Sequence, residues 1–142
     1  MDTNYGFILE STAKKIKLEL QRKFNENNFD ITVDQWVVLL ELHKHGVQNQ
    51  VELCERSFKD APTITRIVEL LIRKGLIDRA SCKNDRRKFN ISLSKKGKQH
   101  IQKLLPVVVA FRKQGWNHLT DKDVQHLVRI TNKININLKN HA

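Results

Sequence analysis

The chain has 142 residues, 39% of them apolar, with five glycines, two prolines and a formal net charge of +11. This size and composition predict one helix-rich globular unit with a core of its own, and they exclude a disordered chain. The longest apolar run, residues 104–111, contains Pro106 and is far shorter than the roughly 20 residues of a membrane-spanning helix, which excludes an integral membrane protein.

The N-terminal half begins with two predicted helices. Apolar residues recur at three- and four-residue steps through residues 7–27, which indicates an amphipathic helix. Thr32 followed three residues later by Gln35 is a capping-box signature for a second helix. Gly46 is placed to end that helix.

Two shorter helices are predicted next. Asn49 can cap a third helix that runs to Arg56, and Pro62 fits the first position of a fourth helix. The third helix is expected to face inward with Val51, Leu53 and Cys54. The fourth helix has an inward stripe made of Ile64, Ile67, Val68 and Leu71. Its other face is left for solvent or for a partner.

A β-hairpin follows, with strands at residues 76–81 and 89–93 and a basic tip between them. Ser94 then caps a long helix that ends near residue 116. Thr120 and Asp123 form the capping box of a last helix, which ends near residue 138.

Positive charge is concentrated around this hairpin. Residues 73–103 carry eleven Lys or Arg against two acidic residues, whereas residues 1–72 carry nine Lys or Arg against eleven acidic residues. A basic segment of this kind is expected of a protein that binds a polyanion. A membrane-surface helix could give a similar count, but this segment is predicted to be strand and turn.

The element order is that of a winged helix-turn-helix. The predicted fold is mainly α with a small β-hairpin, a DNA-binding core flanked by long helices. The segments "ITVDQWVVLLELHKHG", "VELCERSFKDAPTITRIVELLIRKGLIDRA" and "NDRRKFNISLSKKG" resemble, in this order, the second helix, the helix-turn-helix and the wing of the MarR family of bacterial transcriptional regulators. The close resemblance covers residues 31–97.

The resemblance implies a homodimeric DNA-binding regulator, usually a repressor, with a pseudo-palindromic operator. Residues 1–30 would form an N-terminal dimerisation helix, residues 31–97 the DNA-binding domain and residues 98–142 the C-terminal dimerisation helices. Apolar stripes on the outer helices exceed what a small winged-helix core can bury, which also favours a dimer. Family members bind small aromatic or lipophilic effectors between the dimerisation helices and the DNA-binding domain. Trp36 could line such an effector pocket, but filling the core is the more ordinary role for it.

The residues expected to contact DNA lie on two elements. Thr63, Thr65 and Arg66 begin the fourth helix, which would enter the major groove. The wing tip offers Lys83, Arg86, Arg87 and Lys88 to the minor groove and the phosphates, and the resemblance implies that Asp85 orients Arg87 by a salt bridge. Taken separately, each could be an ordinary surface helix or a solvated turn.

Other functions have weaker support. No catalytic motif, cofactor motif or ligand-spaced metal set is present, so we expect no enzyme, no cofactor and no metal. Cys54 and Cys82 form no disulfide framework, and no signal-peptide pattern precedes them, which predicts a cytoplasmic protein. Release of DNA by a small molecule or by oxidation of Cys82 stays open. The alternative function is a winged-helix module that binds protein without sequence-specific DNA binding.

Overall fold

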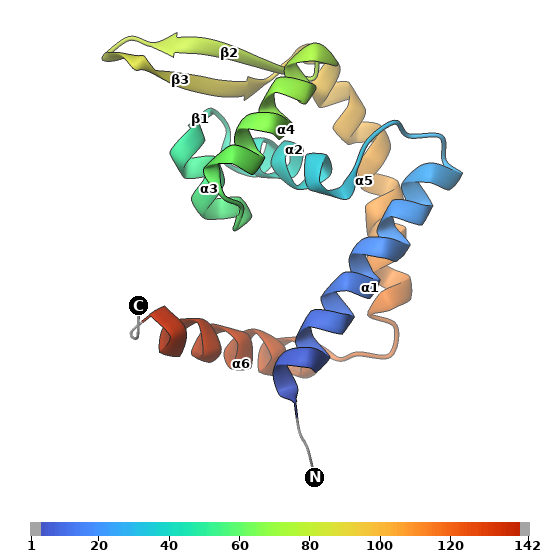
Figure 1. Ribbon diagram of the computed structural model, residues 1–142. Coiled ribbons are helices and arrows are strands. Elements are labelled where there is room, and N and C mark those ends of the chain that lie inside the picture. Colours follow the sequence, from blue (N-terminus) through green and yellow to red (C-terminus); the bar gives the residue numbers. More distant parts are fainter. Residues whose placement is uncertain (1–3, 140–142) are drawn as a thin grey trace. The chain divides into compact units, whose positions relative to one another are not determined.

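The computed structural model describes residues 4–139, apart from the side chain of Arg86 (Figure 1). The elements in chain order are α1 (Tyr5–Glu26), α2 (Val33–His45), β1 (Gln48–Asn49), α3 (Gln50–Ser57), α4 (Ala61–Arg73), β2 (Ile77–Cys82), β3 (Asp85–Leu93), α5 (Lys95–Gly115) and α6 (Asp121–Lys139). The chain divides into two compact units, Met1–Val109 and Ala110–Ala142. The predicted fold class is confirmed.

The first unit is built on helices α2, α3 and α4 and a three-stranded antiparallel sheet with the order β1-β3-β2. β3 is central, because Ile91 pairs with Gln48 of β1 and with Arg79 of β2. The β2–β3 hairpin projects beyond the helices as a wing, residues 77–93 (Figure 1). Strand β1 was not predicted, because two residues are too few to show an alternating pattern.

Helices α2 and α3 begin directly after their predicted capping residues, and α4 begins one residue earlier than predicted. In α2, Thr32 Oγ1 accepts a hydrogen bond from the Gln35 backbone amide at 3.1 Å, and Gln35 Oε1 accepts one from the Thr32 amide at 3.2 Å. In α4, Asp60 is the capping residue, so Pro62 takes the second helical position and not the first. A proline is tolerated there because the first-turn amides have no partner within the helix.

The core of the first unit lies between these helices and the inner face of the sheet. Its fully buried members include Leu39, Leu53, Ile64, Leu71, Ile77 and Ile91. The predicted inward stripe of α4 is confirmed. The prediction for Val51 was wrong, since this side chain is 64% exposed. Val51 precedes the buried Leu53 by two residues, about 200° around a helix, so the two cannot share a face.

The start of α5 packs closely on the wing. Ser94 Oγ accepts a hydrogen bond from the Gly97 amide at 3.0 Å, and the Ser94 amide donates to the carbonyl of Leu76 at 3.0 Å. A Cβ atom at residue 97 would overlap that carbonyl, so only glycine fits. The predicted cap is confirmed, and α5 holds the base of the hairpin.

The second unit contains the last turns of α5 and all of α6. The predicted capping box is present: Asp123 Oδ2 accepts from the Thr120 amide at 2.9 Å, and Thr120 Oγ1 accepts from the Asp123 amide at 3.1 Å. No residue of α6 is buried. Its apolar side chains are all at least 36% exposed and are Val124, Leu127, Val128, Ile130, Ile134, Ile136 and Leu138.

Within residues 4–139, no helix has the length and apolar character needed to cross a membrane. The same part of the chain holds no group of three His, Cys, Asp or Glu side chains arranged to bind a metal ion.

Candidate nucleic-acid interface

The first turns of α4 carry the three residues predicted to contact DNA. Thr63 is half-buried, and Thr65 and Arg66 are exposed on the outer face of the helix. Asp60 Oδ1 accepts a hydrogen bond from the Thr63 amide at 2.8 Å. Hydrogen bonds from the Thr63 hydroxyl and amide hold the pKa of Asp60 below its ordinary value, so this cap is charged at neutral pH.

The Thr65 hydroxyl is already engaged within the protein. It donates to the carbonyl of Ala61 at 2.9 Å and accepts from Gln50 Nε2 at 2.6 Å. Thr65 therefore offers a partner its methyl group and its remaining lone pair. Gln50 was missed in the sequence, because a contact between residues fifteen positions apart leaves no local pattern.

The basic tip of the wing differs from the prediction. β3 begins at Asp85 and not at residue 89, so the tip residues belong to the strand. Ser81 pairs with Phe89 while its neighbour Cys82 pairs with Asp85, so residues 86–88 lie between two successive pairings of β2. This irregularity places three basic residues in a local bulge, and bulges redirect side chains.

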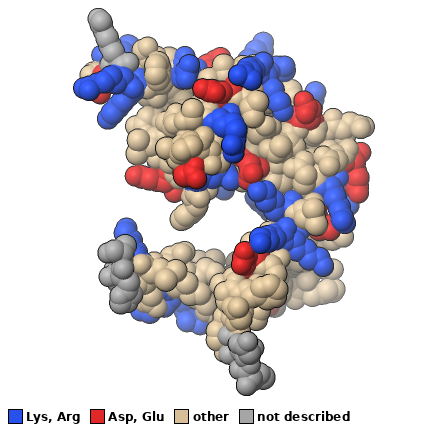
Figure 2. All heavy atoms as spheres, in the orientation of Figure 1, with Lys and Arg blue, Asp and Glu red and all other residues tan. Residues whose placement is uncertain are grey.

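Asp85 and Arg87 interact as the resemblance implied. Asp85 Oδ1 accepts a hydrogen bond from the Arg87 amide at 2.9 Å and lies 3.6 Å from Arg87 Nε. The Arg87 side chain is 94% exposed and that of Asp85 is 35% exposed. Lys83 and Lys88 are also exposed, and the side chain of Arg86 lies outside the described residues. Figure 2 shows Lys and Arg atoms gathered at the end of the wing.

A further basic residue that sequence reasoning missed, Arg79, lies on the same face of the wing as the buried Ile77 and Ile91, nearer the tip. The Arg79 guanidinium lies 4.8 Å from the centre of the Phe89 ring. Since Ser81 pairs with Phe89, Arg79 is the diagonal neighbour of this ring on the same face. The strand alternation could have revealed this pair.

A cavity of about 440 Å³ lies beside the C-terminal end of α4. It is lined by the α1–α2 loop, the α4–β2 turn and α5, through residues 27–31, Lys74, Leu76, Lys96, His100, Lys103 and Leu104. Trp36 is not among them. It is 2% exposed and packs edge-on against Phe24, with ring centres 6.3 Å apart.

The two cysteines are both half-buried and unpaired by a disulfide. Burial, assisted by the nearby carboxylate of Asp60, raises the pKa of the Cys54 thiol above its ordinary value. A raised pKa makes this thiol a poor nucleophile, in agreement with a structural role. A redox role of Cys82 stays a prediction.

Known proteins are similar to this chain in sequence and in fold. The family model of the MarR family matches residues 31–89, which span the helix-turn-helix and most of the wing. A solved structure of a Listeria innocua protein of unknown function is 32% identical, with 94% of this chain and 91% of that chain covered and a TM-score of 0.70. The chain belongs to the MarR family.

Two other solved structures share the MarR-family fold. One describes regulation of DNA binding of Bordetella bronchiseptica BpsR by 6-hydroxynicotinic acid. It is 20% identical, covers 94% of this chain and 99% of its own, and has a TM-score of 0.83. The other is a mutant MarR from E. coli complexed with operator DNA. It is 24% identical, with the same two coverages and a TM-score of 0.77. Both likenesses show that the chain has the winged-helix fold of the MarR family.

Proposed function

We propose that this protein is a homodimeric transcriptional repressor that binds a pseudo-palindromic operator in the cytoplasm. The observation that carries the proposal is the pairing of an exposed α4 face, with Thr65 and Arg66, and a wing whose tip residues 86–88 are bulged and basic. A recognition helix in the major groove and arginines at the minor groove use these two features together. The operator complex of the E. coli relative supports this use of the fold.

The proposed dimer rests on α6. Seven apolar side chains of this helix are exposed, and water contact with so large an apolar surface is unfavourable. We propose that residues 1–30 and 98–142 form the dimer interface, while residues 31–97 bind DNA. Two recognition helices would then address successive major grooves about 34–36 Å apart.

The salt dependence of DNA binding tests the function against a protein-docking module. If the dimer engages about 6–10 phosphates, the affinity for DNA should fall roughly 10³- to 10⁵-fold between about 50 and 200 mM salt. A protein that binds DNA only incidentally would show weak binding at both salt concentrations. A flat response would favour the docking module.

We further propose that the cavity beside α4 is the effector site and that it takes a small aromatic acid. Lys74, Lys96 and Lys103 supply positive charge, and Leu76 and Leu104 supply apolar walls. His100 Nδ1 lies 3.1 Å from the carbonyl oxygen of Lys96. Because that oxygen can only accept, Nδ1 is the donor, and Nε2 of the neutral ring is left to accept a hydrogen bond from a hydroxyl group of the ligand. Regulation of BpsR by 6-hydroxynicotinic acid, an aromatic acid, supports this ligand class.

Benzoate and benzamide form a matched pair of probes for this cavity. Benzoate should bind in the cavity and cause the protein to release DNA. Benzamide, which has the same ring without the charge, should do neither. Lys103→Met should weaken the binding of benzoate, because Lys103 lines the cavity and is otherwise exposed. Equal binding of both probes would contradict an acid-selective site.

A further inference from the structure

The short loop that starts the recognition helix is held in an unusual conformation. Phe58, Lys59 and Asp60 are the only residues between α3 and α4. Phe58 has φ of +56°, a left-handed conformation that is uncommon for a side chain other than Gly or Asn. The residue is 91% exposed, so little packing of its side chain holds it there. A strained residue of this kind persists only where other contacts fix the backbone.

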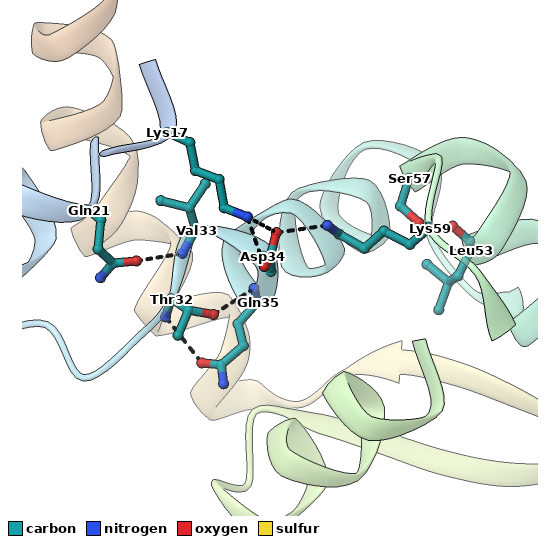
Figure 3. A network of polar contacts seen from close by, with 9 residues as sticks. All are labelled: Lys17, Gln21, Thr32, Val33, Asp34, Gln35, Leu53, Ser57 and Lys59. Carbon is teal, nitrogen blue, oxygen red and sulfur yellow. Dashed lines mark hydrogen bonds and ion pairs between the residues drawn. The ribbon is translucent and has the colours of Figure 1, made fainter. Parts of the chain in front are cut away.

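The backbone amides of Phe58 and Lys59 donate to the carbonyl of Cys54 at the end of α3, and a side-chain contact with α2 also holds this loop. Lys59 Nζ donates to Asp34 Oδ1 at 2.7 Å, and the Lys59 side chain is only 18% exposed. Lys59 lies directly before Asp60, the cap of the recognition helix. Figure 3 shows Asp34 between Lys59 and a second lysine, Lys17. The Lys59–Asp34 ion pair is therefore one residue away from the cap of α4.

Asp34 is itself held from the other side. Lys17 of α1 lies 2.9 Å from Asp34 Oδ1 and 3.0 Å from Oδ2, so it contacts both carboxylate oxygens. The α1–α2 connection is also fixed by Gln21, which accepts from the Val33 amide at 2.9 Å (Figure 3). Gln21 also donates to the Ile31 carbonyl at 3.0 Å. Asp34 thus links α1 to the start of the recognition helix.

We propose that Asp34 is a positioning residue for DNA binding. By holding Lys59, it helps to keep Phe58 in its left-handed conformation and so directs the first residues of α4 toward the major groove. Lys59 is used within the protein and does not contact a phosphate. This inference rests on the proposed function, and it adds a residue that touches no DNA to the set that determines operator affinity.

The test compares affinity for two DNA duplexes: a site that the wild-type protein selects from a random pool, and an unrelated sequence. Asp34→Asn removes the charge and keeps the shape of the side chain. It should weaken binding to the selected site roughly 2- to 30-fold and leave binding to unrelated DNA unchanged. Simple electrostatics predicts tighter binding to both, because the variant is more positive.

Two variants separate positioning from charge. Lys59→Met changes the net charge in the opposite direction, yet it should cause the same loss of affinity for the selected site. The double variant Asp34→Asn/Lys59→Met should lose no more than the Asp34→Asn variant, since both substitutions break the contact between Lys59 and Asp34. Glu26→Gln is the charge control, because Glu26 pairs only within α1, with Lys23 at 3.5 Å, and its side chain is 64% exposed.

A rescue variant tests the mechanism itself. Asparagine adopts left-handed φ more readily than phenylalanine, so Phe58→Asn should restore affinity for the selected site in the Asp34→Asn background. Unchanged or tighter binding by Asp34→Asn, an equal loss on both duplexes, or no rescue by Phe58→Asn overturns the inference. If the wild type selects no site, the proposed function fails instead, so the two failures are distinguishable. Circular dichroism confirms that each variant is folded.

Discussion

Asp85 Oδ1 accepts a hydrogen bond from the backbone amide of Arg87 at 2.9 Å and lies 3.6 Å from Nε of the same residue. One carboxylate oxygen therefore contacts both the backbone and the side chain of the arginine. The guanidinium is almost fully exposed, so this ion pair contributes little to folding stability. We propose that its effect is to restrict where this exposed arginine points.

Arg87→Ala tests whether the wing binds DNA. The variant should weaken binding to every sequence, lower the salt slope by about one unit, and reduce any A·T preference in the outer flanks of the site. Fluorescence anisotropy with labelled duplexes at several salt concentrations measures all three. Arg22→Ala removes the same charge from α1 and should change the salt slope less. An unchanged slope for Arg87→Ala would mean that the wing is only a solvated hairpin.

Asp85→Asn separates orientation from charge at the same place. The variant is more positive, so electrostatics alone predicts tighter DNA binding. We expect weaker binding, because the side-chain amide of asparagine would hold the Arg87 guanidinium less strongly than the Asp85 carboxylate does. Titration of the same duplex with both proteins decides the sign, and tighter binding by Asp85→Asn would refute the orienting role.

The sequence was most informative where structure is local. The capping pair Thr32 and Gln35, the inward stripe of α4 and the end of α2 at Gly46 all involve residues within one or two turns, and all three predictions are confirmed. The hairpin was also predicted, but its strand β3 starts four residues earlier than the basic composition suggested.

The features that were missed depend on residues far apart in the sequence. Strand β1 is defined by its pairing with β3, forty residues away, and not by its own two residues. The ion pairs from Lys17 through Asp34 to Lys59 join α1, α2 and the loop between α3 and α4. No periodicity in the sequence reveals such contacts. The prediction that Val51 is buried was wrong for a different reason, because the sequence of a short helix does not show clearly which side faces the core.

Gly97→Ala should destabilise the first unit. The added methyl group would overlap the carbonyl of Leu76, and moving it away would disturb the start of α5 and the base of the wing. Overpacking of this kind costs about 1–3 kcal/mol in the free energy of unfolding, measured by urea denaturation. Gly115→Ala is the control, since nothing lies within 4 Å of its added Cβ. Equal stability of the two variants would show that α5 and the wing are not packed as described.

The stability contributed by Asp34 should depend on pH. Burial raises the pKa of Asp34, but hydrogen bonds and charges from Lys59 and Lys17 outweigh this and place it below the ordinary value of 3.8. Because the folded pKa is the lower one, the stabilisation is complete above the unfolded pKa and is lost as the pH falls through the folded pKa. The excess stability of the wild type over Asp34→Asn should persist at neutral pH and shrink below about pH 3.8. A difference that stays constant in acid would contradict these ion pairs.

The most direct measurement is selection of bound DNA from a random pool by the wild-type protein. Two recognition helices related by dimer symmetry should select a two-fold symmetric site, with half-site centres about 10–10.5 base pairs apart or a multiple of that spacing. Such a site would establish sequence-specific binding and dimerisation together. A pool that stays random after repeated rounds, or that yields a single unpaired half-site, would contradict the proposed operator-binding dimer.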